Sequence, residues 1–239
     1  GSAGCFNLRE MMEGLEMGPA STSLEHDKAE PPANCGVCPR LVAFRADNQA
    51  KSPDWFNGAV RSFGNPDAAR VLIVGLAPGL QGANKTGRPF TGDYAGDLLY
   101  GTLLKFGFAR GKYGQRADDG LSLDGVMITN AVRCVPPANK PTGPEIKNCR
   151  AYLTARIKSL SRLTVIIALG RIAHESTLSA LGLKRAAFPF SHCGEHDVGG
   201  GLTMIDSYHC SRYNTNTGRL TTEMFEAVFA ATQARLTQA

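Results

Sequence analysis

A long polar segment that follows a short apolar run carries the side chains of this 239-residue chain that best suit a nucleotide ligand. The apolar run is VLIV at residues 71–74, and the next residues turn through glycine and proline. Glycine lets the backbone approach a ligand closely. The segment then offers an amide, two cations, an aromatic ring and an acid, at Asn84, Lys85, Arg88, Phe90 and Asp93. Loops of this length are usually functional, so we favour a binding site here over an ordinary connecting loop.

Two further polar residues belong to other apolar runs. Asn130 lies within the run VMITNAV at residues 126–132, and His209 directly follows the run LTMIDSY at residues 202–208. The strands of a parallel sheet end at one common edge, where ligands bind. We therefore expect Asn130, His209 and Asp93 to converge at that edge. A turn-capping role for Asn130, a helix-capping role for Asp93 and a surface position for His209 are the alternatives.

The elements that must position these residues are short apolar runs that alternate with helical patterns. Four runs have no alternation of polar and apolar residues, as in a parallel sheet that is covered on both faces. They lie at residues 71–74, 126–132, 164–169 and 202–208. Apolar residues at helical spacing predict helices over about 97–108, from about 144, after 170 and from about 221. The predicted fold is α/β, a three-layer α-β-α sandwich around a four-stranded parallel sheet, with right-handed connections.

Four of the seven cysteines are spaced as metal ligands would be. Cys35 and Cys38 form a Cys-x-x-Cys pair, Cys134 follows the second apolar run, and Cys149 falls in the helix expected from about residue 144. The capping-box pattern of Thr142 and Glu145 marks the start of that helix. Four thiolates can hold a structural zinc ion or an iron–sulfur cluster, and the spacing does not separate the two. Four unrelated buried thiols are the alternative.

Other histidines and cysteines are assigned structural roles. His192, Cys193 and His196 stand close together in the segment FPFSHCGEHD, but this segment is short and loop-like, and we expect no metal there. His174 lies in the helix expected after residue 170, where a lone histidine is usually a hydrogen-bonded core residue. An odd number of cysteines also argues against a framework of disulfides.

Composition and charge suggest one main domain. Residues 1–33 are polar and end in two prolines, so we expect a cloning remnant at residues 1–4 and a disordered extension up to residue 33, followed by a single domain over residues 34–239. The net charge of +5 is compatible with a nucleic-acid partner but does not establish one. With no apolar stretch long enough to span a membrane and no secretory signal, we expect a cytoplasmic protein.

Three segments together resemble a known family. They are GLAPGLQGANKTGRPFTGD, TNAVRC with a further cysteine fifteen residues on, and SYHCSRYNTNTGRLT. The combination is similar to the uracil-DNA glycosylase superfamily, most closely its iron–sulfur branch of the b type, called family 5. The likeness runs from about residue 34 to the end of the chain. It implies an enzyme that flips out and hydrolytically removes uracil, and also other deaminated bases such as hypoxanthine or xanthine, from DNA.

The resemblance also implies roles for individual residues. Asp93 would activate water, His209 would lie close to the leaving base, and the amide of Asn130 would recognise the uracil edge. A structural four-iron four-sulfur cluster would be held by Cys35, Cys38, Cys134 and Cys149. Uracil itself would be bound, with stacking on the aromatic ring, by Gly75, Leu76, Ala77, Pro78, Gly79, Asn84 and Phe90. Contacts with DNA would come from Lys85, Arg88, Arg212, Tyr213, Asn214 and Arg219.

Two positions depart from the wider superfamily pattern. Leu76 stands where a related branch of the superfamily, the a type, carries an acid, so the residue that activates water must come from elsewhere. Asp97 competes with Asp93 for that role. Cys210 stands where many members have proline. No lysine is placed as a Schiff-base nucleophile, so we expect a monofunctional enzyme, and we expect a monomer. The alternatives are a non-catalytic iron–sulfur protein that binds DNA or senses redox state, and a hydrolase of small nucleotides.

Overall fold

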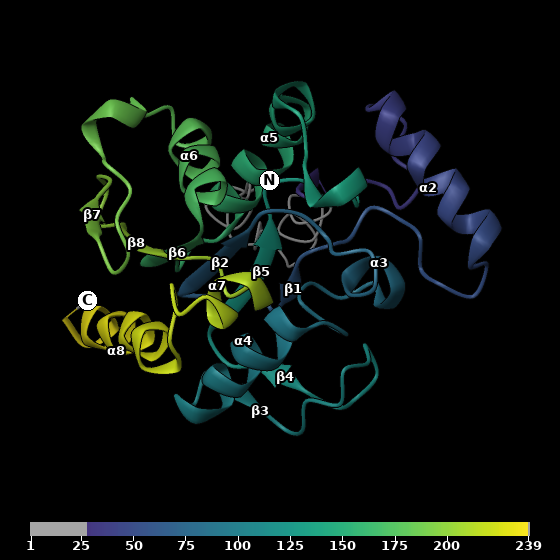
Figure 1. The fold of residues 1–239 in the computed structure, drawn as a ribbon. Helices are drawn as coiled ribbons and strands as arrows, with labels where there is room; N and C mark the ends of the chain where they lie inside the picture. The colour runs from purple at the N-terminus through teal and green to yellow at the C-terminus, as the bar shows by residue number, and fades with distance from the viewer. Residues whose placement is uncertain (1–27, 239) are drawn as a thin grey trace, which may run out of the picture.

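A mixed six-stranded sheet forms the centre of the protein, whose computed structural model describes residues 28–238 (Figure 1). Its order is β1-β5-β2-β6-β8-β7. The four central strands are parallel and comprise β5 (Val126–Asn130), β2 (Val71–Gly75), β6 (Val165–Leu169) and β8 (Thr203–Ser207). The predicted parallel strands are therefore confirmed. The sheet is not limited to four strands, because β1 (Phe63–Gly64) and β7 (Glu195–Asp197) pair antiparallel along its two edges.

Helices cover both faces of this sheet and give the predicted three layers. Successive residues of a strand point to opposite faces. Val71 and Ile73 accordingly pack towards α4 (Tyr94–Lys105) and α8 (Thr222–Gln238). Leu72 and Val74 pack towards α5 (Gly143–Ser159) and α6 (Arg171–Ala180). Figure 1 shows these two helix pairs on opposite sides of the sheet.

The helix boundaries are set by local capping. The predicted capping box is present, because Thr142 and Glu145 each bond the other's backbone at the start of α5. Helix α4 differs from the expected 97–108, since Asp93 caps it one residue before Tyr94 and it ends at Lys105. Gly107, with φ of +74°, then turns the chain into β3 (Ala109–Arg110). This strand pairs with β4 (Ser122–Leu123) in a separate two-stranded sheet.

Several short elements connect the layers. They are α2 (Pro39–Lys51), α3 (Ala83–Thr86) and α7 (Arg212–Asn216), with 3₁₀ turns at Pro137–Asn139 and Arg185–Ala187. No helix in the described part of the chain is long and apolar enough to cross a membrane.

The packed body begins before residue 34. Ala29 is fully buried, and the carboxylate of Glu30 forms buried ion pairs with Arg133 at 2.6 Å and Arg156 at 2.5 Å. Residues 28–33 thus belong to the domain, and the rest of the predicted extension lies outside the described residues.

Candidate active site

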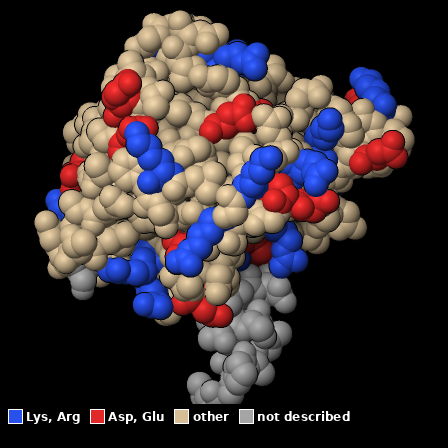
Figure 2. Space-filling model, turned by 90° about the horizontal axis from the view of Figure 1, so that it is seen from below, with Lys and Arg blue, Asp and Glu red and all other residues tan. Residues whose placement is uncertain are grey.

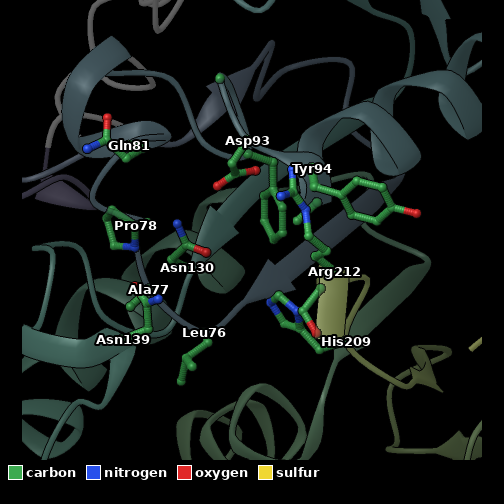
Figure 3. A pocket seen from close by; sticks show the side chains of 15 residues that line it. Leu76, Ala77, Pro78, Gln81, Asp93, Tyr94, Asn130, Asn139, His209 and Arg212 are labelled. Carbon is green, nitrogen blue, oxygen red and sulfur yellow. The ribbon is translucent and has the colours of Figure 1, made fainter. Parts of the chain in front are cut away.

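A cavity of about 670 Å³ opens at the carboxyl edge of the parallel strands. Its wall is formed by the segments after β2 and β8, by the end of β5 and by the 3₁₀ turn that follows β5. Figure 3 shows Asp93, Asn130 and His209 pointing into the same space. The convergence that we expected from the strand order is therefore present. The lining residues are Leu76, Ala77, Pro78, Gly79, Gln81, Phe90, Gly92, Asp93, Tyr94, Ala95, Asn130, Asn139, His209, Ser211 and Arg212.

Asn130 offers an unused hydrogen-bonding atom at the base of the cavity. It ends β5, pairs in register with Gly75 and is only 3% exposed. Its Oδ1 atom has no hydrogen-bond partner among the described residues. A buried acceptor without a partner costs about 1–3 kcal/mol. A ligand that donates an N–H would remove this cost, as the edge of uracil can.

Gly75 must be a glycine because both neighbours approach its backbone closely. A Cβ atom built on Gly75 would overlap with Oδ1 of Asn130 and with the ring of Phe90. Phe90 itself has a φ of +52°, a left-handed conformation that costs a residue other than glycine about 1–3 kcal/mol. Such strain clusters at functional sites. Gly75 shapes the cavity floor without lining it, and the aromatic ring forms one wall.

Asp93 combines a capping role with an open position in the cavity. Its Oδ1 accepts a hydrogen bond of 3.0 Å from the backbone N–H of Gly96 and so caps α4. A Cβ built on Gly79 would lie 2.9 Å from Oδ2, and one on Gly82 would overlap with it. These two glycines therefore leave room for the second oxygen. Burial raises the pKa of Asp93, while the hydrogen bond from Gly96 opposes this rise.

His209 enters the cavity from the segment after β8. Its ring centroid lies 6.2 Å from that of Phe90, with 30° between the two planes. Burial lowers the pKa of His209 to about 4, so the imidazole is neutral at pH 7. Its backbone is held by Asn214, whose amide donates to the His209 carbonyl at 2.8 Å. The next residue, Cys210, is fully buried and its thiol donates to the carbonyl of Ala95 at 3.6 Å.

Two predicted site residues lie elsewhere. Asn84 does not line the cavity, and its amide donates to Oδ1 of Asn57 at 2.9 Å in a fully buried position. Its role is to join α3 to the segment at residue 57. The competing acid, Asp97, is exposed and accepts a hydrogen bond of 2.6 Å from Gln115 outside the cavity. Of the two acids, only Asp93 can reach a ligand there.

The predicted DNA contacts divide into buried and exposed side chains. Arg88 is only 4% exposed and binds Asp119 through two hydrogen bonds of 2.8 and 2.7 Å, so it cannot contact a phosphate. Arg212 and Tyr213, which is 73% exposed, start α7 at the cavity rim. Lys85 and Arg219 are also exposed, over the rings of Trp55 and Tyr208.

Charge alone does not mark a DNA-binding surface on the face seen in Figure 2. Cationic and anionic side chains are intermixed over that face. The net charge of +5 is therefore not gathered there into one patch. Arg212, an exposed cation that lines the cavity, is the better candidate for a phosphate contact.

Sequence reasoning missed several cavity residues. Gln81 and Tyr94 lie in the segment that we had assigned to binding, and position in that segment was the available signal. Asn139 comes from the turn after Cys134 and has a left-handed φ of +55°. This turn follows β5, so the rule that ligands bind beyond strand ends also pointed to it.

The four predicted cysteine ligands gather on one side of β5. Their sulfurs are close enough for each thiol to influence the pKa of another, and they pack with Ala77 of the cavity loop. Four thiolates gathered in one place can hold either a structural zinc ion or an iron–sulfur cluster.

Each of these four sulfurs has its own hydrogen-bond partner. Arg45 donates to Sγ of Cys134 at 3.7 Å, and Asn148 donates to Sγ of Cys38 at 3.5 Å. The Tyr152 hydroxyl bonds Cys35, and the backbone of Arg133 bonds Cys149. Burial, together with the charges of the neighbouring cysteines, raises the pKa of Cys134 to about 12, which would keep its thiol protonated. A donor at every sulfur is suited to thiolates, the form in which cysteine binds a metal.

His174 has the structural role that its helix predicted. Its Nδ1 lies 2.7 Å from Asp206 and its Nε2 lies 2.9 Å from the Phe188 carbonyl. His196 bonds the same carboxylate at 2.9 Å, and His192 bonds the backbone of Met224 and Tyr208. Hydrogen bonds within the fold thus occupy both ring nitrogens of His174 and of His192, and the Nε2 atom of His196.

Comparisons with known proteins agree with this geometry. A family model described as the uracil DNA glycosylase superfamily matches residues 61–233, so the chain belongs to this superfamily. A type-5 uracil-DNA glycosylase of Thermus thermophilus is 45% identical over 197 residues, covering 80% of this chain and 89% of the relative. A type-5 uracil-DNA glycosylase of Pyrobaculum aerophilum is 39% identical and covers 82% and 86%. A type-4 uracil-DNA glycosylase of Archaeoglobus fulgidus is 33% identical but covers only 49% and 52%.

Proposed function

We propose that this protein is a monofunctional uracil-DNA glycosylase that hydrolyses the N-glycosidic bond of uracil in DNA as a step of base-excision repair. One observation carries the proposal: Asp93, Asn130 and His209 converge from three segments around one cavity. Their types match the reaction, which needs a carboxylate near the sugar, an amide at the base edge and a donor for the departing base. The family relationship supports the same conclusion.

The cavity suits a base that has left the helix. A base within a duplex cannot be reached, so it is flipped out at a cost of about a few kcal/mol. Stacking on an aromatic ring returns about 1–3 kcal/mol. The ring of Phe90 lies in the cavity wall and can supply this stacking. A U·G mismatch lowers the cost of flipping because its pairing is weaker.

Bond cleavage leaves positive charge on the sugar and negative charge on the base. Oδ2 of Asp93 can stabilise the first and orient the attacking water, since its other oxygen is occupied by the helix cap. His209 is neutral at pH 7 and can donate a hydrogen bond to the second. One such preorganised donor lowers the activation free energy by about 3–4 kcal/mol. Asn130 has both a donor and an acceptor for the uracil edge.

We propose further that Cys35, Cys38, Cys134 and Cys149 hold a structural four-iron four-sulfur cluster. Such a cluster would fix α2 and α5 against the strand end that carries Asn130, without taking part in the hydrolysis. The gathering of the four cysteines and the hydrogen-bond donor at each sulfur support this assignment. Iron and sulfide analysis with the visible absorption spectrum of the purified protein tests it. A colourless protein that contains one zinc ion would refute it.

We propose that four exposed side chains contact DNA. Arg212 and Tyr213 would lie beside the flipped base, and the other two are Lys85 and Arg219. The cavity of about 670 Å³ also has room for deaminated purines, so we include hypoxanthine and xanthine among the proposed substrates. We propose that the protein acts as a monomer, because Asp93, Asn130 and His209 of one copy already meet at one cavity.

Uracil release from a labelled oligonucleotide with one U·G pair tests the central proposal. The parent should release uracil, and Asp93→Asn should be slower by at least about a hundredfold. Asp97→Asn is the matched control, because Asp97 lies four residues further on and points out of the cavity. Equal loss in both variants would move the chemistry away from Asp93. No release by cluster-loaded parent would favour a DNA-binding protein without catalysis.

A further inference from the structure

The turn between Phe90 and Asp93 carries two of the groups on which the proposed reaction depends. Phe90 has a φ of +52° and Gly92 one of +96°. Strained backbone of this kind persists only where surrounding groups fix it from more than one side. Within the loop, Thr86 donates to the Thr91 carbonyl at 2.9 Å and Arg88 donates to the Thr91 hydroxyl at 2.8 Å. Neither bond reaches the backbone of Phe90 or Gly92, which is held by a group from elsewhere in the fold.

Tyr113 is such a group, although it lies outside every motif that sequence analysis had marked. Its hydroxyl accepts a hydrogen bond of 3.2 Å from the Gly92 N–H and donates one of 3.2 Å to the Phe90 carbonyl. One oxygen atom therefore connects the two sides of the strained turn. A Cβ on Gly96 would lie 2.5 Å from this hydroxyl and would overlap with the Phe90 carbonyl. Helix α4 thus has a glycine where the turn and the tyrosine meet.

The position of Tyr113 is itself fixed by buried groups. Its ring stacks on that of Tyr100, with 4.6 Å between centroids, and the Tyr100 hydroxyl donates to the carbonyl of Pro89 at 2.7 Å. The Arg88 guanidinium lies over both rings, at 5.2 and 5.8 Å, and is paired with Asp119. The carboxylate of Asp119 also accepts hydrogen bonds from the backbone of Gly114 and Leu121 and so shapes the loop that bears Tyr113.

From these contacts we propose that Tyr113 is a positioning residue that sets the placement of the Phe90 ring relative to the Asp93 carboxylate. The loop over residues 111–121 then serves as a support for the active site. This inference rests on the proposed function, because it concerns the rate of base release. Tyr113 touches the turn and does not line the cavity.

Tyr113→Phe is the direct test, since it keeps the ring stacking and removes both hydrogen bonds. We expect the single-turnover rate of uracil release to fall about 10- to 100-fold, with the Kd for uracil-containing DNA changed less than about threefold. Tyr208→Phe is the matched control, because its ring contacts with His192 and Arg219 remain. That variant should match the parent.

A second variant keeps the test decisive if Tyr113→Phe fails to fold. Asp119→Asn keeps the size of the side chain but weakens the ion pair with Arg88 and the contacts that shape the loop bearing Tyr113, and it should also slow release with little change in DNA binding. An active parent with an unslowed Tyr113→Phe would overturn the inference and leave the proposed function intact. Slowing that matches the loss of DNA affinity would also overturn it. An inactive parent would instead refute the proposed function.

Discussion

His174 is buried and His209 is half-buried, and the groups around the two imidazole rings differ. Both ring nitrogens of His174 meet groups of the fold, Asp206 on one side and the Phe188 carbonyl on the other. The ring of His209 makes no hydrogen bond to another described residue that would occupy its nitrogens, and it faces the cavity beside Phe90. The hydrogen-bond partners of the ring therefore separate the structural from the functional histidine.

The proton arrangement follows from the same partners. A carbonyl oxygen can only accept, so Nε2 of His174 must carry a proton. Its Nδ1 lies 2.7 Å from the Asp206 carboxylate, so both ring nitrogens have a partner within the fold. At the cavity the imidazole is neutral, the second oxygen of Asp93 is open and Oδ1 of Asn130 lacks a partner. One region satisfies its polar groups internally, and the other keeps them available for a ligand.

The largest expected effect comes from removing the ring at the cavity. His209→Ala should lower the rate of uracil release by about 10²–10³-fold, because one preorganised donor to the departing base is lost. Its free energy of unfolding should stay near that of the parent, since no hydrogen bond of the fold is broken. Single-turnover kinetics and thermal unfolding measure the two quantities. A destabilised His209→Ala with normal kinetics would reverse the comparison.

The matching substitution at His174 should lower the stability of the fold and leave the rate of uracil release unchanged. His174→Ala removes one partner of a buried pair, which costs about 3–5 kcal/mol of stability. The rate per folded molecule should be unchanged, because His174 lies outside the cavity. Denaturant unfolding, with activity normalised to the folded fraction, checks both parts. Slow release by the folded fraction would show that the Asp206 region is coupled to the reaction.

The pH dependence of the free energy of unfolding should report on His209, with an effect smaller than that of either substitution above. Burial holds the pKa of His209 at about 4, below the value of about 6.5 for an unfolded chain. Between these two values the unfolded state binds a proton that the native state does not, so this group destabilises the protein as pH falls from about 6.5 to about 4. His209→Gln should lose less stability than the parent over that range. Equal losses in thermal midpoint would contradict the assignment.

The contrast between paired and unpaired groups also explains what the sequence could predict. The four central strands were predictable because buried parallel strands are unbroken apolar runs, and the ends of β2, β5 and β8 then placed Asp93, Asn130 and His209 at one edge. Edge strands β1 and β7 were missed because two or three residues carry no such pattern.

Pairing partners could not be read from the sequence in the same way. Arg88 looked like a phosphate contact because Asp119, its partner, is 31 residues away and meets it only in the folded chain. Asn84 looked like a uracil ligand for the same reason, since Asn57 lies 27 residues before it. Local sequence shows which groups can do chemistry, and tertiary contacts decide which of them remain available.

The smallest expected effect extends this contrast to the arginines. Arg212 is exposed at the cavity rim over the ring of Tyr94, and Arg212→Ala should weaken binding of DNA similarly for all sequences. If it contacts one phosphate, the slope of log K against log salt should fall by about 1. Arg110→Ala is the matched control, because Arg110 is exposed and pairs with Asp124 in the region of β3. An equal change of slope in both variants would mean that DNA affinity depends on the overall charge of the protein and that Arg212 makes no specific phosphate contact.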